Sequence, residues 1–345
     1  MLQRNPAACL DDRELREDEV RVSAARYLGV DKEQVALTGS TTMGLALVYN
    51  GIPLHPGQEV LTTVHDHYAT QEALKFRSDK DGTVVRTIPL FKTPENASVD
   101  EIIESFTKHL NEKTRLVALT WVHSGSGVKL PIAKIGQIIE DANRTRSERD
   151  RIIFCVDGVH GFGVEEMTFA DLKCDFFVAG THKWMFGPRG TGIICSRARH
   201  MEGLLPTVAS FSSYDTFGRA MTYGGFHAFE HQWALKKAFD FHLSIGKAEV
   251  ASRIHGLNTY LKQRLGEVPR VELVTPRSTD LSAGFTFFRV RGVDPYAVED
   301  ALWEDRIVVS GADRDVGPVV RLAPGLLNDE AELDRVIDSL KRRFS

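Results

Sequence analysis

The chain has 345 residues, of which 42% are hydrophobic and 26% charged, and its formal net charge is −4. This composition suits a soluble protein with one large and one smaller domain, and it gives no reason to expect nucleic acid or a membrane surface as a partner. No apolar run is long enough to span a bilayer, and no signal peptide begins at Met1. The four cysteines, Cys9, Cys155, Cys174 and Cys195, form no CxxC pair, which favours reduced side chains and a cytoplasmic protein.

The first part of the chain alternates between helical and strand-like hydrophobic patterns. Residues 13–28 have the spacing of a helix that stops at Gly29, whereas residues 1–12 show no regular pattern. Further on, the patterns predict strands at 35–37, 59–64, 84–90 and 116–122, and helices at 43–49, 69–76, 99–110 and 132–142. Such alternation predicts a mainly parallel sheet that is covered by helices on both faces.

A cluster of hydroxyl side chains lies between the first predicted strand and the helix that follows it. The segment reads Thr38-Gly39-Ser40-Thr41-Thr42. Unpaired N–H groups and the dipole at a helix N-terminus attract phosphate, but serine and threonine are also common helix N-caps. The glycines form neither GxGxxG nor a Walker motif, which makes a dinucleotide or ATP site a poor interpretation.

A His-Asp-His triplet, His65-Asp66-His67, follows the strand at 59–64 and precedes Tyr68. In an extended chain the two histidines would share one face, so the triplet could bind a metal ion and make the protein a metal-dependent hydrolase. No further ligand motif such as HxHxDH accompanies it. We therefore expect no metal site here and keep the hydrolase as the alternative of another class.

The most informative stretch runs from Arg151 to Gly192. An apolar run at 152–156 ends at Asp157, a second at 176–179 leads into Thr181-His182-Lys183-Trp184, and a third follows at 191–195. Such runs are typical of buried strands, and ligands of open α/β sheets bind where parallel strands end. A lysine and a carboxylate at this edge suit pyridoxal phosphate, because the lysine forms a Schiff base with its aldehyde and the carboxylate keeps its ring nitrogen protonated.

The pattern becomes less regular after this stretch. Residues 207–225 are rich in Ser, Thr, Tyr and Gly and should form a loop, and residues 230–251 should form one helix that bridges to a second domain. Beyond it, we predict a helix from about 253, strands at 271–274, 285–290, 307–309 and 319–322, and helices at 295–303 and 329–344. We expect a large α/β domain at 1–240 and a small α+β domain at 241–345.

Three motifs in the right order make the family recognisable. The pattern D-G-x-H at Asp157, then T-H-K-W around Lys183 and G-P-R-G-T-G from Gly187, resembles the class V aminotransferase family of fold-type I pyridoxal-phosphate enzymes. The resemblance extends from about Val35 to the end of the chain. It implies an α/β fold of the fold-type I transferase kind, with a mainly parallel, seven-stranded type of sheet in the large domain.

The resemblance also implies roles for individual residues. It assigns cofactor contacts to Thr41, Thr42, His67, Ser124, Asp157, His160, Thr181, His182 and Lys183. His67 falls at the position that stacks on the ring, although another register would give that place to His65 or Tyr68. His123 is either a proton donor or a polar loop residue, so the expected catalytic residues are Lys183, His67 and His123.

Contacts to the substrate and to a second subunit follow from the same resemblance. Arg321 matches the arginine that binds the substrate carboxylate, and Arg189 has a less certain match. The family works as a homodimer in which a loop of one subunit reaches the phosphate of the other. Residues 223–227 align with that loop, but glycine replaces its threonine. The segment before Ser40 is shorter than is usual in relatives, which implies either a compact variant or an unusually open substrate pocket.

The reaction type is not specified by these motifs. Ser124 stands where desulfurases carry asparagine, and no cysteine follows Cys195 to act as a persulfide carrier before Arg321. We therefore expect an epimerase-like or lyase-like enzyme that acts at Cα of an amino acid or small amine. Transamination, C–S cleavage, carbon-bond formation and an inactive cofactor-binding scaffold remain alternatives.

Overall fold

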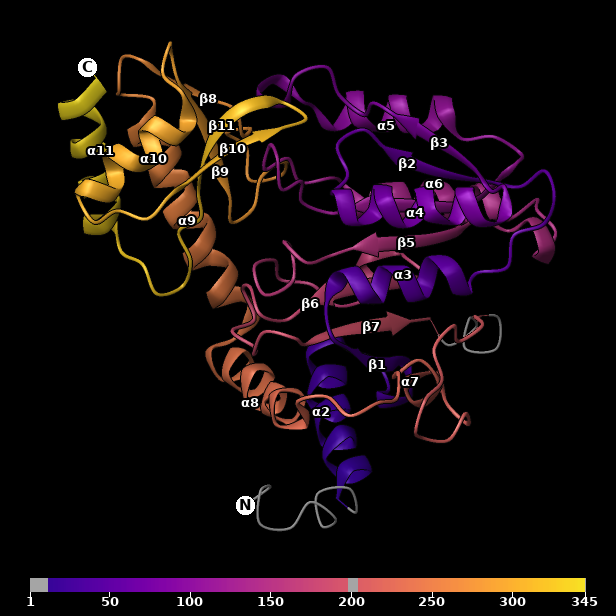
Figure 1. The fold of residues 1–345 in the computed structure, drawn as a ribbon. Coiled ribbons are helices and arrows are strands. Elements are labelled where there is room, and N and C mark those ends of the chain that lie inside the picture. Colours follow the sequence, from indigo (N-terminus) through magenta and orange to yellow (C-terminus); the bar gives the residue numbers. More distant parts are fainter. Residues whose placement is uncertain (1–11, 198–203, 345) are drawn as a thin grey trace.

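The computed structural model describes residues 12–197 and 204–344, so Cys9 lies outside the described residues. Seven strands pair into one sheet in the order β1-β7-β6-β5-β4-β2-β3 (Figure 1). All its neighbouring strands are parallel except at β7, which is antiparallel to both β1 and β6. The strands are β1 (Val35–Thr38), β2 (Glu59–Thr63), β3 (Val84–Ile88), β4 (Thr114–Thr120), β5 (Ile153–Asp157), β6 (Phe176–Gly180) and β7 (Gly192–Ser196). The expected mainly parallel, seven-stranded sheet is confirmed.

Helices cover both faces of this sheet, because alternate residues of its buried strands point to opposite sides. Phe154 and Val156 of β5 join one core with α2, α5, α6 and α8, whereas Ile153 and Cys155 join another with α3, α4 and α7. These helices are α2 (Arg13–Leu28), α3 (Thr41–Gly51), α4 (Tyr68–Asp81), α5 (Val99–His109), α6 (Ile132–Asn143), α7 (Phe217–Ala220) and α8 (Phe229–Ile245). Short 3-10 turns occupy Lys32–Gln34, Pro94–Asn96, Glu148–Asp150 and Ala170–Leu172.

The C-terminal part forms an antiparallel sheet of its own, in the order β10-β11-β9-β8, with a separate apolar core (Figure 1). Its elements are α9 (Lys247–Leu265), β8 (Val271–Leu273), β9 (Thr286–Val290), α10 (Pro295–Glu304), β10 (Ser310–Arg314), β11 (Gly317–Leu322) and α11 (Glu330–Phe344). The smaller α+β unit therefore exists, while a domain boundary at residue 240 stays a prediction. None of the described helices combines the length and apolar character needed to cross a membrane.

Three expectations from the sequence were wrong in detail. The single helix predicted at 230–251 is broken at Gly246, whose φ of 101° is incompatible with a helix, so α8 ends and α9 begins there. Residues 307–309 are not a strand: Ile307 N–H closes a turn onto Leu302, Val308 is 76% exposed, and β10 starts only at Ser310. The loop predicted at 207–225 contains the short helix α7.

The parallel strands end at one edge of the large sheet, and this edge positions the site. β1, β2, β4, β5 and β6 run in the same direction, with β7 reversed between β1 and β6. The loops that follow them therefore meet, although they begin as far apart in the chain as residues 39 and 181. This is where open α/β sheets bind their ligands.

Candidate active site

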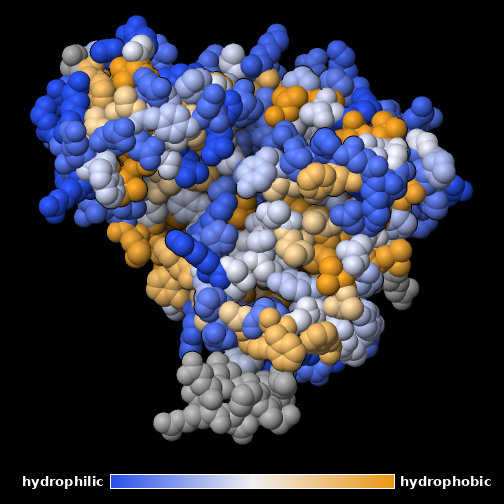
Figure 2. Space-filling model, viewed as in Figure 1, coloured by the Kyte–Doolittle hydropathy of each residue, from blue (hydrophilic) through white to orange (hydrophobic). Residues whose placement is uncertain are grey.

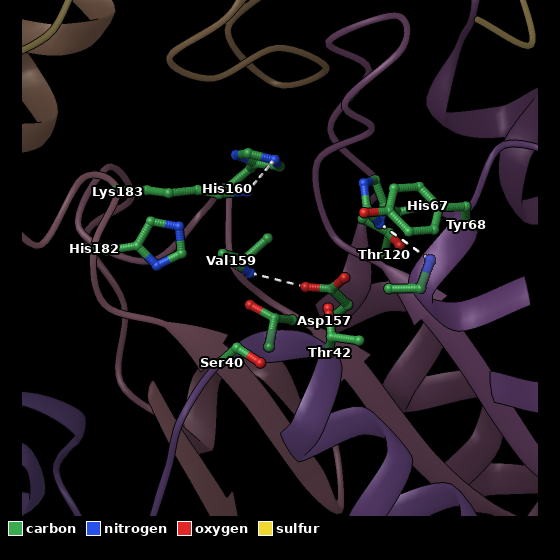
Figure 3. Close-up of a pocket in the computed structure, with 12 residues that line it drawn as sticks. Ser40, Thr42, His67, Tyr68, Thr120, Asp157, Val159, His160, His182 and Lys183 are labelled. Carbon is green, nitrogen blue, oxygen red and sulfur yellow. Dashed lines mark hydrogen bonds between the residues drawn. The ribbon is translucent and has the colours of Figure 1, made fainter. Parts of the chain in front are cut away.

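A cavity of about 240 Å³ lies at this carboxyl edge (Figure 3). Its lining comes from the loops after five strands and the starts of two helices: Ser40, Thr41, Thr42, His67, Tyr68, Ala69, Thr120, Asp157, Val159, His160, His182 and Lys183. Seven of the residues predicted as cofactor contacts therefore lie around one space.

Lys183 projects into this cavity from the turn after β6. Its amine, Nζ, lies 3.0 Å from Nε2 of His160. The side chain is open to the cavity, yet the pKa of Lys183 is lowered to about 8, chiefly by desolvation; Asp157 opposes this shift and the charge of Arg321 adds to it. An amine with such a pKa is partly unprotonated near neutral pH, as a nucleophile or a proton acceptor must be.

Asp157 forms the floor of the cavity at the end of β5, and it is buried. Its Oδ1 accepts a hydrogen bond of 3.1 Å from the backbone N–H of Val159. Burial raises the pKa of Asp157 to about 6, against the opposing effects of that hydrogen bond and of Lys183. The next residue must be glycine, because a Cβ on Gly158 would overlap the ring of Phe177. A carboxylate in such a place is suited to a cationic partner.

His160 is buried beside Lys183, with its ring packed edge-on against Phe285 at a centroid distance of 4.5 Å. Its Nδ1 has no hydrogen-bond partner among the described residues. Burial and then the charge of Lys183 hold the pKa of His160 well below its usual range. The imidazole is therefore neutral, and one ring nitrogen is left for a ligand.

The start of α3 presents free backbone amides to the cavity. Ser40 Oγ accepts from the N–H of Met43 at 3.1 Å, and Thr41 Oγ1 accepts from the N–H of Gly180 at 2.8 Å. No hydrogen bond among the described residues engages the N–H groups of Thr41 and Thr42, since the first amides of a helix have no intrahelical partner. These amides line the cavity and suit a phosphate.

His67 enters the cavity from the side opposite Lys183 (Figure 3). It caps α4, since its Nδ1 accepts from the N–H of Ala69 at 3.2 Å, and its ring lies 4.1 Å from that of Tyr68. The pKa of His67 is lowered to about 4 by burial, then by the charges of Lys183 and Arg314. Of the three registers left open by the sequence, His67 and Tyr68 line the cavity and His65 does not.

The metal-site alternative does not fit this geometry. His65 turns to Asp315 instead, with Nδ1 2.9 Å from Oδ2. The buried carboxylate of Asp66 accepts hydrogen bonds from Thr62, Thr63 and the Thr120 N–H on its two oxygens. Nowhere within residues 12–197 and 204–344 do three side chains gather as a metal-binding group. His65 and Asp66 are thus engaged by partners in their own chain, and the triplet does not converge on one point.

A second cavity, of about 510 Å³, adjoins the first and shares His160, His182 and Lys183 with it. Arg321 lies on its wall, where the guanidinium carbon is 5.4 Å from the centre of the Phe285 ring and Nη2 donates to Ser310 Oγ at 3.4 Å. Trp184 and Leu327 add apolar surface. This space can take a substrate that reaches Lys183 from the side of Arg321.

Several predicted residues lie outside both cavities. His123 is fully buried, and neither ring nitrogen has a partner among the described residues; it faces His65 and Phe91, so nothing in its position supports a catalytic role. Ser124 and Arg189 line neither cavity. Thr181 is buried behind Lys183 and braces its turn by a 2.6 Å hydroxyl contact with Thr191.

Sequence reasoning missed one polar residue in the lining. Thr120 ends β4, and its buried Oγ1 has no hydrogen-bond partner among the described residues. Its position at the carboxyl end of a predicted strand was a usable clue. In the segment expected to reach a second subunit, Tyr223 packs against Gly39 of the same chain, where an added Cβ would lie 2.6 Å from its hydroxyl; the contact to a second subunit stays a prediction.

The residues present fit pyridoxal phosphate. The cavity offers an amine at Lys183 for the aldehyde, a buried carboxylate at Asp157 for the ring nitrogen, and free helix amides at Thr41 and Thr42 for the phosphate. The unpartnered Nδ1 of His160 and Oγ1 of Thr120 are polar atoms that a polar ligand would satisfy. His67 and Tyr68 can cover the open face of a planar ring.

Comparison with known proteins agrees with this fit. The chain is 27% identical to isopenicillin N epimerase from Streptomyces clavuligerus and 29% identical to that from Amycolatopsis lactamdurans, over 93% of this chain and 83% of each relative. It is 25% identical to a probable cysteine desulfurase of Halalkalibacterium halodurans, over 90% of this chain and 77% of that protein.

Solved structures share the fold. A mutant of C-DES, with glycine covalently linked to its PLP cofactor, superposes with a TM-score of 0.89 at 22% identity, over 100% of this chain and 90% of that one. The apo cysteine desulfurase from Thermococcus onnurineus gives 0.83 at 20% identity, over 97% and 85%. The class V aminotransferase family matches residues 14–335. The chain therefore belongs to the class V aminotransferase family and is an enzyme whose cofactor is pyridoxal phosphate.

Proposed function

We propose that this enzyme moves a proton at Cα of an amino acid, in an epimerase-like or lyase-like reaction without a protein persulfide. The observation that carries the proposal is the placement of two proton-carrying groups, Lys183 and His67, on opposite sides of one cavity (Figure 3). Inversion at a carbon needs a proton to leave one face and another to arrive on the opposite face. The bound cofactor supplies an electron-withdrawing ring that stabilises charge at Cα.

The chain's own residues would share the remaining work. Arg321 would bind the substrate carboxylate and so orient Cα toward the amine of Lys183. With a pKa of about 8, that amine is largely protonated near neutral pH and can deliver a proton to one face of Cα. His67, with a pKa of about 4, is neutral at the same pH and can accept the proton that leaves the other face; in the reverse direction the two residues exchange these roles. Asp157 would hold the proton on the cofactor ring nitrogen, since the charge of that pair stabilises its ionised form.

The cysteines support a reaction without a persulfide. Cys155, Cys174 and Cys195 are fully buried within or beside the sheet, and desolvation raises the pKa of each thiol. A thiolate that attacks a substrate sulfur must be accessible and stabilised by positive charge. Neither cavity contains a cysteine.

The test is proton exchange in heavy water. Amino acids of both configurations are incubated with the holoenzyme, and Cα deuterium, chirality and products are followed by NMR and chiral chromatography. Deuterium uptake with inversion would support epimerisation, and loss of a β-substituent would support a lyase. A keto acid formed in step with an aminated partner, or a new carbon bond, would support the transferase alternatives and overturn the proposal.

The two sides of the cavity can be separated in the same assay. His67→Ala should keep deuterium uptake on the face served by Lys183 but lose inversion by about 10²-fold or more. Lys183→Ala should lose exchange altogether. Equal effects of His67→Ala on exchange and inversion would contradict the use of two faces.

We also propose that the enzyme is a homodimer in the cytoplasm. Apolar side chains such as Phe211, 56% exposed, and Phe226, 80% exposed, lie on the segment that precedes α8. Figure 2 shows apolar residues gathered low on the face in view. Such a patch favours a protein partner. Sedimentation velocity tests the dimer, and a monomer at micromolar concentration would contradict it.

A further inference from the structure

The β10–β11 hairpin carries two arginines on one of its faces. In the antiparallel register, Ser310 pairs with Arg321 and Arg314 pairs with Gly317. Directly paired residues share a face, and so do residues two apart along a strand. Arg314 therefore projects from the same face as Arg321, which lines the second cavity.

Packing shows that this face is turned toward the site. Ala312 and Val319, the pair that separates the two arginines, are both buried, and Val319 belongs to the core of the large sheet. The opposite face packs on α10, since a Cβ on Gly311 would lie 2.7 Å from the carbonyl oxygen of Pro295. The hairpin thus presents both arginines to the large sheet.

The tip of the hairpin is held against two active-site loops. Asp315 Oδ2 lies 2.9 Å from Nδ1 of His65, two residues before His67. Gly125, in the loop after β4, leaves room for the tip, because a Cβ there would lie 3.1 Å from Cβ of Arg314 and would overlap the Asp315 carboxylate. The backbone of Arg314 is therefore held near the loop that carries His67, while its exposed side chain lies outside the lining of both cavities.

Neither guanidinium has a carboxylate partner in the described part of the chain. Arg321 donates only to the Ser310 hydroxyl, and Arg314 has no hydrogen bond or ion pair there. Burial is the main cause that lowers the pKa of Arg321 and of His67, and the charge of Arg314 adds to both shifts, which agrees with its lying near both side chains. Asp315, the neighbouring acid, is already paired with His65. Arg321 lines the second cavity, and the exposed Arg314 lies near it without an ion-pair partner among the described residues.

We propose that Arg314 binds a second carboxylate of the substrate, so that the enzyme acts on amino acids with an acidic group at the far end. This inference rests on the proposed function, in which Arg321 takes the α-carboxylate. The two arginines lie four residues apart along the hairpin, roughly 13 Å between Cα atoms. Their long side chains can shorten this span and close on a dicarboxylic chain lying across the entrance.

The first test measures binding without turnover. Adipate and hexanoate have the same chain length and no amine, so they bind without reacting; calorimetry on the holoenzyme gives their dissociation constants. We expect adipate to bind about tenfold or more tightly than hexanoate, because its second carboxylate gains one charge-assisted contact. Arg314→Gln should remove this preference, and Arg144→Gln, which alters an exposed arginine at the end of α6, should keep it.

The second test uses turnover and reverses the charge. The wild-type enzyme should prefer 2-aminoadipate to norleucine in kcat/KM, and Arg314→Glu should instead favour lysine, a change that a purely structural role would not produce. Equal losses for acidic and neutral ligands in Arg314→Gln would overturn the proposal. An enzyme that turns over no amino acid would refute the proposed function, while the adipate preference would still report on Arg314.

Discussion

The amine of Lys183 and Nε2 of His160 lie 3.0 Å apart, on loops that follow neighbouring strands of the large sheet. The buried imidazole is neutral and can accept a hydrogen bond from the lysine ammonium. This contact directs the amine into the cavity above Asp157. It also means that the amine must leave His160 when it forms a bond elsewhere.

Lys183→Ala should remove the covalent link to the cofactor. Only an amine at this place can bond the aldehyde, so the variant should lose the yellow absorbance that survives gel filtration and should trap no cofactor with borohydride. Mass spectrometry of the reduced protein gives the measurement. Lys236→Ala, at a partly buried i,i+4 ion pair with Asp240 on α8, should behave as wild type. A reduced adduct on the Lys183→Ala protein would refute the assignment.

Asp157→Asn should impair catalysis more than cofactor binding. An amide cannot hold the ring proton by charge, so we expect turnover to fall by about 10²–10³, or about 3–4 kcal/mol of barrier stabilisation. The measurement is the steady-state rate with the amino acid that reacts fastest in the heavy-water assay. An unchanged rate would count against this role for Asp157.

The same substitution should stabilise the protein without cofactor. Because burial raises the pKa of Asp157 from 3.8 to about 6, the folded protein holds a proton that the unfolded chain releases, and stability falls as pH rises through this interval. Near neutral pH the cofactor-free Asp157→Asn variant should therefore gain about 1–3 kcal/mol over wild type, with the difference vanishing at about pH 4. Urea unfolding at both pH values checks this, and a gain that does not change with pH would contradict it.

Incubation with L-cysteine should leave no persulfide on Cys155, Cys174 or Cys195, because all three are buried. A persulfide-trapping reagent followed by peptide mapping makes the measurement. Cys9 lies outside the described residues and is tested separately with Cys9→Ser. A trapped persulfide that disappears in that variant would restore the desulfurase reaction.

Gly125→Ala should disturb the hairpin tip, whereas Gly256→Ala should be harmless. A methyl group on Gly125 meets the Asp315 carboxylate and Cβ of Arg314, so the tip must move and KM should rise about tenfold with a modest loss of stability. Nothing surrounds the corresponding position on Gly256 in α9, so alanine there should add about 0.5–1 kcal/mol. Kinetics and thermal unfolding of the pair decide the matter, and equal KM values would contradict docking of the tip.

The sequence was sufficient to predict those parts of the site that depend on strand ends. Asp157 and Lys183 follow uninterrupted apolar runs, and the first polar residues after such a run mark where the buried strand ends. What could not be predicted depends on tertiary packing: His65 and His67 have the same residue type and local pattern, and contacts with Asp315 and Phe91 turn His65 away from the cavity. The break at Gly246 was missed for a similar reason, since a single glycine is tolerated in a helix unless packing requires a positive φ.

The reversed strand β7 makes the site a reporter of complete folding. It separates β1 from β6, so we expect the hydrogen bond between Thr41 and Gly180 to form once β7 has entered the sheet between their strands. During synthesis, the helix start at Thr41 would thus be made early and Lys183 late. The two would remain apart until residue 196, the end of β7, had been added. Cofactor colour in a refolding experiment should appear together with closure of this part of the sheet, and a chain that ends before β7 should stay colourless.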